Sequence, residues 1–310
     1  MTHPSPPPLS PMMLGTVQLG MPYGIANAQG QPNYDEARDI VRTAWEAGVR
    51  WLDTAAGYGE SEAVLGRALA ELGLRDRMGV VTKLRWLDDI ASDPAAAQAL
   101  ITQSVQESRD RLGLETIPIC LFHREEDVAQ LPELLALQAQ GRIGAAGCSV
   151  MTPEAMARML ASPGLAAIQA PVSVLDRRFA RAGLLQAAAD RGIPVFARSV
   201  YVQGLVLLAE ERIPPFLNEL VPVLRALWGL AAEAGLSLGE LALRAVLAEP
   251  GVQCVVVGAE TEAQVRESAA YAARGPLPPD LAAAVRAAVP ILPDQLVMPH
   301  YWKNREPSTP

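Results

Sequence analysis

The sequence has few residues of the kinds that form disulfides or hold metals. Its 310 residues include only three cysteines, Cys120, Cys148 and Cys254, and each lies in an apolar run typical of a strand. Their spacing does not pair them and no cluster of histidines lies nearby, so the ligand pattern of a zinc site is missing. We therefore expect buried thiols in a reducing cytoplasm and no metal.

Long apolar runs and an excess of positive charge are missing as well. No apolar run approaches the roughly 20 residues of a membrane-spanning helix. The first residues, Met-Thr-His-Pro, lack the basic and apolar regions of a secretion signal. The formal net charge of −8 opposes binding to nucleic acid or to anionic membranes. These absences predict a cytoplasmic protein that acts on a small molecule, and they do not determine its oligomeric state.

Short apolar runs alternate with amphipathic helical patterns along most of the chain. Eight strand-like runs are nearly all followed by helices, and no change of composition marks a linker. Eight such units in this length predict a single-domain α/β fold, the (β/α)8 or TIM barrel. A doubly wound sheet is the alternative, but the first strand-to-helix turn lacks a Gly-x-Gly-x-x-Gly sequence.

The same patterns divide the chain into a barrel over residues 12–292, a disordered proline-rich segment at 1–11 and a tail at 293–310. Within the barrel we expect single helices over 127–140 and 178–191, and an insertion over 201–234 that interrupts the alternation. His3 and His300 fall in the terminal segments. His123 is therefore expected to be the only histidine in the folded body.

Ionisable side chains follow three consecutive strands. Asp53 ends the second strand, Tyr58 lies in the loop after it, Lys83 ends the third strand and His123 ends the fourth. In a barrel these positions meet at the carboxyl ends of the strands, where active sites lie. Taken alone, the stretch around Asp53 and Tyr58 also fits a structural role, with the carboxylate holding the loop and the ring half-buried. The four together favour catalysis.

These residues suit proton transfer to a carbonyl oxygen. A phenol titrates near ~10, so Tyr58 exchanges protons poorly at neutral pH without a neighbouring charge. The Lys83 ammonium would favour the phenolate, and Asp53 would keep Lys83 protonated. His123 would hydrogen-bond the substrate oxygen or share the proton. The set predicts reduction of a carbonyl, with hydride arriving from a cofactor.

Motifs spread from residue 14 to about residue 268 resemble those of the aldo-keto reductases. They are Leu14-Gly-Thr-Val-Gln-Leu-Gly20, Leu52-Asp-Thr-Ala-Ala-Gly-Tyr58, Val81-Thr-Lys83, Leu121-Phe-His123, Gly147-Cys-Ser149, Gln169 and Val257-Gly-Ala259. The resemblance implies a (β/α)8 barrel that binds NADPH, with NADH possible as the cofactor. It implies reduction of an aldehyde or ketone, sugar-like in one bacterial subgroup, with Tyr58 as the proton donor.

The resemblance also implies roles for individual residues. The catalytic residues would be Asp53, Tyr58, Lys83 and His123. The cofactor would be bound by Gly15, Thr16, Ser149, Gln169, Arg198, Ser199, Gly204, Gly258, Ala259, Glu260, Thr261, Gln264, Glu267 and Ser268.

Three positions depart from the family pattern. Val150 stands where the family usually has asparagine, so one hydrogen bond to the nicotinamide carboxamide is expected to be lost or replaced. Arg198 stands where many members stack an aromatic ring on the nicotinamide. Its guanidinium would stack there, which we favour, or pair with an acidic substrate group. Gln264 replaces the commonest arginine for the 2′-phosphate, which weakens the expected preference for NADPH, although amides of residues 259–261 could still bind a phosphate.

Two other functions remain open at this point. A non-catalytic, cofactor-binding regulatory subunit would have the same fold and residues, but no hydrophobic docking segment is evident. A Schiff-base lyase would use Lys83 as its nucleophile. Asp53 beside Lys83 would keep that amine charged, which opposes the lyase interpretation.

Overall fold

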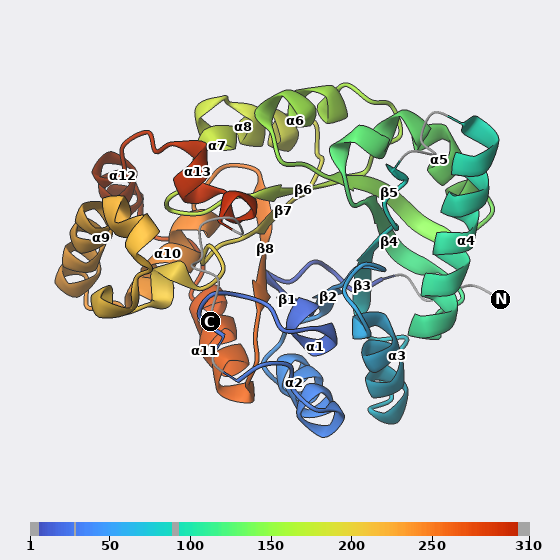
Figure 1. Ribbon diagram of the computed structural model, residues 1–310, viewed down its shortest axis with the longest axis horizontal. Helices are drawn as coiled ribbons and strands as arrows, with labels where there is room; N and C mark the ends of the chain where they lie inside the picture. The colour runs from blue at the N-terminus through green and yellow to red at the C-terminus, as the bar shows by residue number, and fades with distance from the viewer. Residues whose placement is uncertain (1–5, 28, 89–92, 303–310) are drawn as a thin grey trace.

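Parallel strands close into a barrel in the computed structural model of the chain, which describes residues 6–27, 29–88 and 93–302 (Figure 1). The strands follow sequence order around the ring, and β1 pairs with β8 to close it. They are β1 (Met12–Gly15), β2 (Trp51–Asp53), β3 (Gly79–Lys83), β4 (Ile117–Phe122), β5 (Ile143–Ser149), β6 (Ala167–Pro171), β7 (Val195–Arg198) and β8 (Val252–Gly258). The predicted TIM barrel is confirmed.

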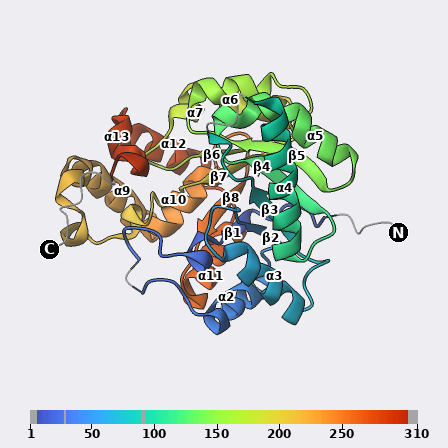
Figure 2. The same ribbon diagram turned by 45° about the vertical axis from the view of Figure 1, so that its right-hand side comes forward.

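Helices surround the strands (Figures 1 and 2). Those of the βα repeat are α2 (Tyr34–Glu46), α3 (Ser61–Glu71), α4 (Pro94–Leu112), α5 (Leu131–Ala139), α6 (Pro153–Leu160), α8 (Leu184–Asp190), α10 (Leu238–Leu247) and α11 (Glu262–Ala273). Sequence signals account for several of their ends. The Asn33 side chain and Glu36 form a capping box at the start of α2, and Gly113 ends α4 with a left-handed backbone. Within the described residues, no helix has the length and apolarity needed to cross a membrane.

Two expected single helices are interrupted. The helix predicted over 178–191 is α7 (Arg178–Arg181) followed by α8, because Gly183 between them has a φ of +70°. The segment predicted as a helix over 127–140 begins as a 3-10 helix (Glu125–Gln130) and becomes helical only at Leu131, where α5 starts. Glycine takes positive φ without strain, so one such residue ends a helix that apolar periodicity alone would continue.

Large apolar side chains fill the barrel interior. This inner cluster consists of Met13, Trp51, Val81, Ile119, Leu121, Ala167, Phe196, Cys254 and Val256. Trp51, at the amino end of β2, donates its indole N–H to the Pro7 and Pro8 carbonyl oxygens at 3.1 and 3.2 Å. Residues 7 and 8 are thus held against the barrel, although the sequence predicted disorder there. Residues 1–5 of that predicted segment lie outside the described part of the chain.

The predicted tail folds back over the barrel. It contains α13 (Asp294–Val297) and a 3-10 helix (Pro299–Tyr301). Leu296, Val297, Met298 and Trp302 are buried with residues of α9 (Val221–Glu233) and α12 (Pro279–Ala288) in a second core. This packing carries His300 to the mouth of the barrel. The expectation that His123 is the only histidine in the folded body was therefore wrong, and residues 303–310 lie outside the described chain.

Candidate active site

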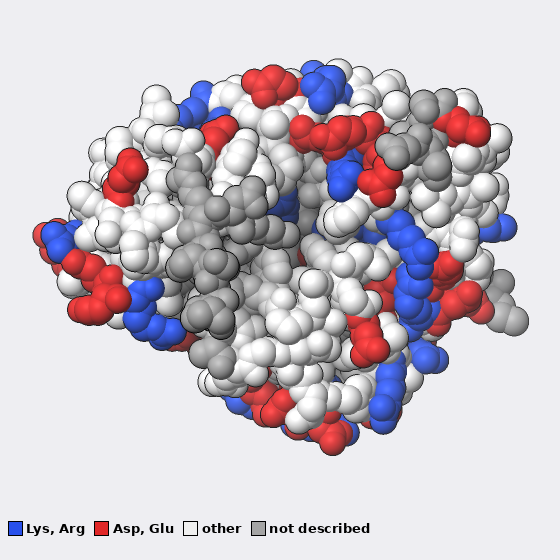
Figure 3. Space-filling view, in the orientation of Figure 1, with Lys and Arg blue, Asp and Glu red and all other residues white. Residues whose placement is uncertain are grey.

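A cleft of about 1380 Å³ opens at the carboxyl ends of the strands. Figure 3 shows the hollow in the middle of this face, with Lys or Arg atoms visible in its depth. It is lined by the predicted catalytic residues Asp53, Tyr58, Lys83 and His123. Of the predicted cofactor residues, it is lined by Gly15, Thr16, Ser149, Gln169, Arg198, Ser199, Gly204, Gly258, Glu260, Gln264, Glu267 and Ser268. Ala259 and Thr261 do not line it.

A buried ion pair lies at the floor of the cleft. Asp53 is 4% exposed and Lys83 is 1% exposed. Lys83 Nζ donates to Asp53 Oδ1 at 2.8 Å, to Asp53 Oδ2 at 2.9 Å and to the Thr54 carbonyl oxygen at 2.9 Å. Burial alone would lower the pKa of Lys83, but Asp53 and Tyr58 beside it hold that pKa above its ordinary value. Lys83 is therefore cationic at neutral pH.

The loop that carries Tyr58 is fixed between β2 and α3. It packs closely on α1 (Val17–Gly20), where a Cβ at Gly20 would lie 2.0 Å from the Tyr58 carbonyl oxygen. Ser61 at the start of α3 donates to the Thr16 carbonyl oxygen at 2.8 Å and so holds the end of the loop. The Tyr58 ring centroid then lies 5.0 Å from Lys83 Nζ. The backbone thus sets the position of the phenol before any ligand binds.

The protonation state of Tyr58 depends on two opposing effects. Burial raises the pKa of the phenol above its ordinary value, and the Lys83 charge opposes this only in part. The sequence analysis expected Lys83 to favour the phenolate, and the burial of the hydroxyl outweighs that effect. Tyr58 therefore carries its proton at neutral pH, which is the form that can protonate a substrate.

His123 stands edge-on to Tyr58, with 5.6 Å between the ring centroids. Trp86, in the loop after β3, also makes an edge contact with the imidazole, with 5.8 Å between the ring centroids. Burial, together with the charges of Lys83, Arg198 and Arg124, lowers the pKa of His123 to about 3. His123 is therefore a neutral imidazole at physiological pH, and it has one N–H to donate.

This depressed pKa predicts that His123 does not titrate near neutrality. Because its pKa is lowered, His123 stays neutral in the folded protein until the pH falls towards 3. The pH profile of kcat/KM should therefore show no acid limb near pH 6.5 that arises from His123. Proton NMR of the imidazole Cε1–H resonances, assigned with His123→Asn, should show no His123 titration shift between pH 5 and 8. A midpoint between pH 6 and 7 would contradict the lowered pKa.

Two carboxamides that line the cleft leave buried oxygen atoms without a hydrogen-bond partner among the described residues. These atoms are Gln18 Oε1 and Gln169 Oε1. Gln169 uses its Nε2 to donate to Asp53 Oδ1 at 2.7 Å, whereas the Gln18 amide lies close against Gly258. A buried acceptor without a donor is costly, so such atoms mark places where a ligand can donate. The amide donors of a nicotinamide and the hydroxyls of a ribose fit this requirement.

The amino end of α11 is already capped. Gln264 Oε1 accepts hydrogen bonds from the backbone N–H groups of Glu260 at 2.7 Å and Thr261 at 3.3 Å. In return, Thr261 Oγ1 accepts from the Gln264 N–H, which completes a capping box. Two of the amides that the sequence analysis offered to a phosphate therefore have an intramolecular partner.

Arg198 ends β7, and the loop after it has unusual backbone geometry. Ser199, Val202 and Gln203 have φ values of +62°, +49° and +55°, in the left-handed region that β-branched residues such as valine avoid. Such conformations persist where the surroundings impose them, often at ligand sites. This loop lines the cleft.

The sequence analysis missed several residues that line the cleft. They are Gln18, Tyr23, Trp86, Met298, His300 and Tyr301. Tyr23, Trp86 and Tyr301 keep 40–47% of their surface exposed. The sequence did contain a signal for His300. Trp302 lies in an apolar segment flanked by prolines, which indicates that the tail packs onto the barrel and brings His300 with it.

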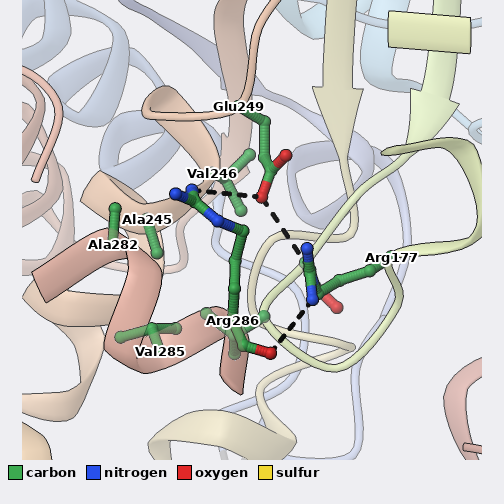
Figure 4. A pocket seen from close by; sticks show the side chains of 9 residues that line it. Arg177, Ala245, Val246, Glu249, Ala282, Val285 and Arg286 are labelled. Atoms are coloured by element: carbon green, nitrogen blue, oxygen red, sulfur yellow. Dashed lines mark hydrogen bonds and ion pairs between the residues drawn. The ribbon is translucent and has the colours of Figure 1, made fainter. Parts of the chain in front are cut away.

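A second, much smaller cavity lies between the loop after β6 and the helices α10 and α12 (Figure 4). Arg177, Glu249 and Arg286 face one another across it, with Arg177 Nε 3.8 Å from Glu249 Oε1. Its volume of about 10 Å³ is enough for no more than a single water molecule. This cavity is too small to hold a substrate.

Comparison with known proteins agrees with this geometry. The Aldo/keto reductase family model matches residues 11–290. D-threo-aldose 1-dehydrogenase of a Pseudomonas species is 29% identical over 77% of this chain and 84% of its own. The NADH-specific methylglyoxal reductase of Escherichia coli is 29% identical over 84% of this chain and 89% of its own.

Solved structures give the same result. Glycerol dehydrogenase from Gluconobacter oxydans superposes with a TM-score of 0.71 at 25% identity, covering 94% of both chains. An aldo-keto reductase from Bacillus halodurans has a TM-score of 0.76 at 23% identity over 95% of this chain and 97% of its own, which supports the fold alone. Because the family model covers most of its length, the chain belongs to the aldo/keto reductase family of oxidoreductases, which use nicotinamide cofactors.

Proposed function

We propose that this protein reduces an aldehyde or ketone to the alcohol, with Tyr58 as the proton donor. One observation carries the proposal. A protonated phenol lies between a buried, cationic Lys83 and a neutral His123, at the floor of a single large cleft. This arrangement offers a hydrogen-bond donor and a proton donor to the same carbonyl oxygen.

The cofactor would supply the hydride when bound. Ser149 and Gln169 would hold its carboxamide, and the unpaired Gln169 Oε1 gives that amide an acceptor. Gln18 would meet the sugar beside it. On the substrate side, His123 would donate its N–H to the carbonyl oxygen and Tyr58 would transfer its proton. Lys83 would then stabilise the phenolate that is left, because its charge is fixed in place by Asp53.

The two other functions are less well supported. A Schiff-base lyase needs a neutral amine, whereas Lys83 keeps its charge and directs three N–H groups to fixed acceptors. A regulatory subunit would bind the cofactor without turnover. Trapping with borohydride in the presence of an aldehyde would detect a lyase. Oxidation of NADH or NADPH by wild-type protein with methylglyoxal and glyceraldehyde tests the reductase, and binding of both cofactors without any turnover would favour the subunit.

For the cofactor we propose NADH rather than the NADPH expected from the family resemblance. Gln264 stands where the resemblance places the cation for the 2′-phosphate, and its amide oxygen is engaged in the α11 cap. The carboxylates of Glu260 and Glu267 line this part of the cleft. The nearest cation along α11, Arg266, is paired with Glu262 at 2.8 Å. A 2′-phosphate dianion would meet acceptors and negative charge here.

We expect NADH to bind at least as tightly as NADPH to the wild-type protein. Gln264→Arg should then tighten NADPH binding by about tenfold or more, because a guanidinium supplies charge-assisted hydrogen bonds to the phosphate. Titration by quenching of tryptophan fluorescence measures both dissociation constants. Gln253→Arg, which adds the same charge at the amino end of β8, is the matched control. Clearly tighter NADPH binding by the wild type would refute the proposal.

A further inference from the structure

Arg198 lines the cleft as a cation that has no counter-ion among the described residues. Its Nη2 donates to the Val150 carbonyl oxygen at 3.1 Å and contacts Met151 Sδ at 2.7 Å, and its Nη1 lies 3.4 Å from Ser199 Oγ. All of these partners are uncharged. Within the described chain, no carboxylate comes within ion-pair distance of its guanidinium. The positive charge of Arg198 and two of its five N–H groups, one on Nε and one on Nη1, therefore remain available.

Other cationic side chains in and around the cleft are neutralised. Lys83 is paired with Asp53 at 2.8 Å, Arg124 with Asp88 at 3.0 Å, and Arg178 with Asp176 at 2.8 Å. Arg198 is different although it is half-buried, where an unpaired charge is costly. In a chain of net charge −8, a free guanidinium at this place calls for a functional explanation.

The charge of Arg198 acts on the groups that would meet the substrate. Burial is the largest influence on the pKa of Tyr58, His123 and His300, and the Arg198 charge adds to it by opposing the raised pKa of Tyr58 and by helping to lower the pKa of the two histidines. His300 is therefore also biased towards its neutral form, in which one N–H can donate. Arg198 thus lies within electrostatic range of both the proton donor and the C-terminal segment that lines the cleft.

We propose that the carbonyl substrate carries an anionic group, a carboxylate or a phosphate, and that Arg198 binds this group. The inference rests on the proposed reductase function. A guanidinium presents paired N–H donors that match the oxygens of both anions. Stacking on the nicotinamide, the role that the sequence analysis favoured, would use the flat face of the guanidinium and leave its charge unbalanced. An anion would supply the missing counter-charge.

Two matched substrate pairs test the proposal. Succinic semialdehyde is compared with its methyl ester, and glyceraldehyde 3-phosphate with glyceraldehyde, each in steady state with saturating NADH. We expect the wild type to prefer the anionic member of at least one pair by about tenfold or more in kcat/KM. The pair that shows the preference identifies carboxylate or phosphate. Raising the salt concentration should increase KM for the anionic member alone.

Variants then assign the effect to Arg198. Arg198→Gln should raise KM for the anionic substrate at least tenfold, leave kcat/KM for its neutral partner within about threefold, and abolish the salt effect. Arg198→Lys keeps the charge without the planar donors, so its KM for the anionic substrate should lie between those of the wild type and Arg198→Gln. Arg124→Gln, whose charge is already paired with Asp88, is the matched control and should keep the wild-type preference.

The outcomes separate this inference from the reductase proposal. Reduction of the neutral aldehydes without preference for either anion would overturn the role of Arg198 and leave the reductase function standing. An equal loss of kcat/KM for both members of a pair in Arg198→Gln, together with weaker NADH binding, would assign Arg198 to cofactor binding. That result would also overturn its role in binding the substrate anion. Reduction of none of the four compounds would overturn the reductase function and this inference with it.

Discussion

Tyr58→Phe is expected to lower kcat for carbonyl reduction by about 10²- to 10⁴-fold, the usual contribution of a positioned general acid. The substitution removes only the hydroxyl, and the ring keeps its edge contact with His123 and its place beside Lys83. The dissociation constant for NADH should stay within about twofold, because the proposed cofactor contacts lie elsewhere. Single-turnover absorbance at saturating NADH measures the hydride-transfer rate directly.

Tyr23→Phe is the matched control for this prediction. Tyr23 is another tyrosine of the cleft, and its hydroxyl accepts from Gln203 Nε2 at 3.4 Å. Loss of that hydroxyl should leave most of the turnover intact. A Tyr58→Phe protein that retained more than a tenth of the wild-type rate would show that the proton comes from another group.

The fold was predictable because its signals are local and repeated. Each βα unit carries its own apolar strand and amphipathic helix, so an error in one unit does not change the architecture. The interrupted helix over 178–191 shows the limit of this reasoning. Periodicity is the same on both sides of Gly183, and only the positive φ of that residue ends the helix. A glycine inside a helical pattern does not by itself reveal which backbone conformation it takes.

The site was predictable where the residue type alone determines the chemistry. It was less predictable where neighbouring groups determine the state of a side chain. Asp53 and Lys83 end β2 and β3, and His123 directly follows β4, so the barrel brings them together. The state of Tyr58 depends on how deeply its hydroxyl is buried, and the sequence could not supply that depth. Gln264 stands where the resemblance places an arginine for the phosphate, and the sequence could not reveal that its oxygen caps α11. His300 depends on the packing of Trp302, which lies far in sequence from every barrel strand.

Lys83→Met is expected to have a second large effect, on both stability and turnover. The substitution removes the only cation paired with Asp53 in the described chain, and the carboxylate left behind is 4% exposed. An uncompensated buried charge costs about 3–5 kcal/mol in the free energy of unfolding. Turnover should also fall by at least about 10²-fold, because the phenolate left after proton transfer loses its stabilising charge. Urea denaturation and steady-state kinetics measure the two losses separately.

The double variant Asp53→Asn with Lys83→Met distinguishes the two effects. With both charges gone the burial penalty largely disappears, so the free energy of unfolding should recover by about 2 kcal/mol or more relative to Lys83→Met. Turnover should not recover, because the ammonium is still missing. Arg111→Met provides a matched control, since it leaves the buried Glu62 without its partner at 2.8 Å but lies outside the cleft. That variant should lose stability and keep its turnover. Recovery of turnover in the double variant would mean that Lys83 supports the fold of the site and not its chemistry.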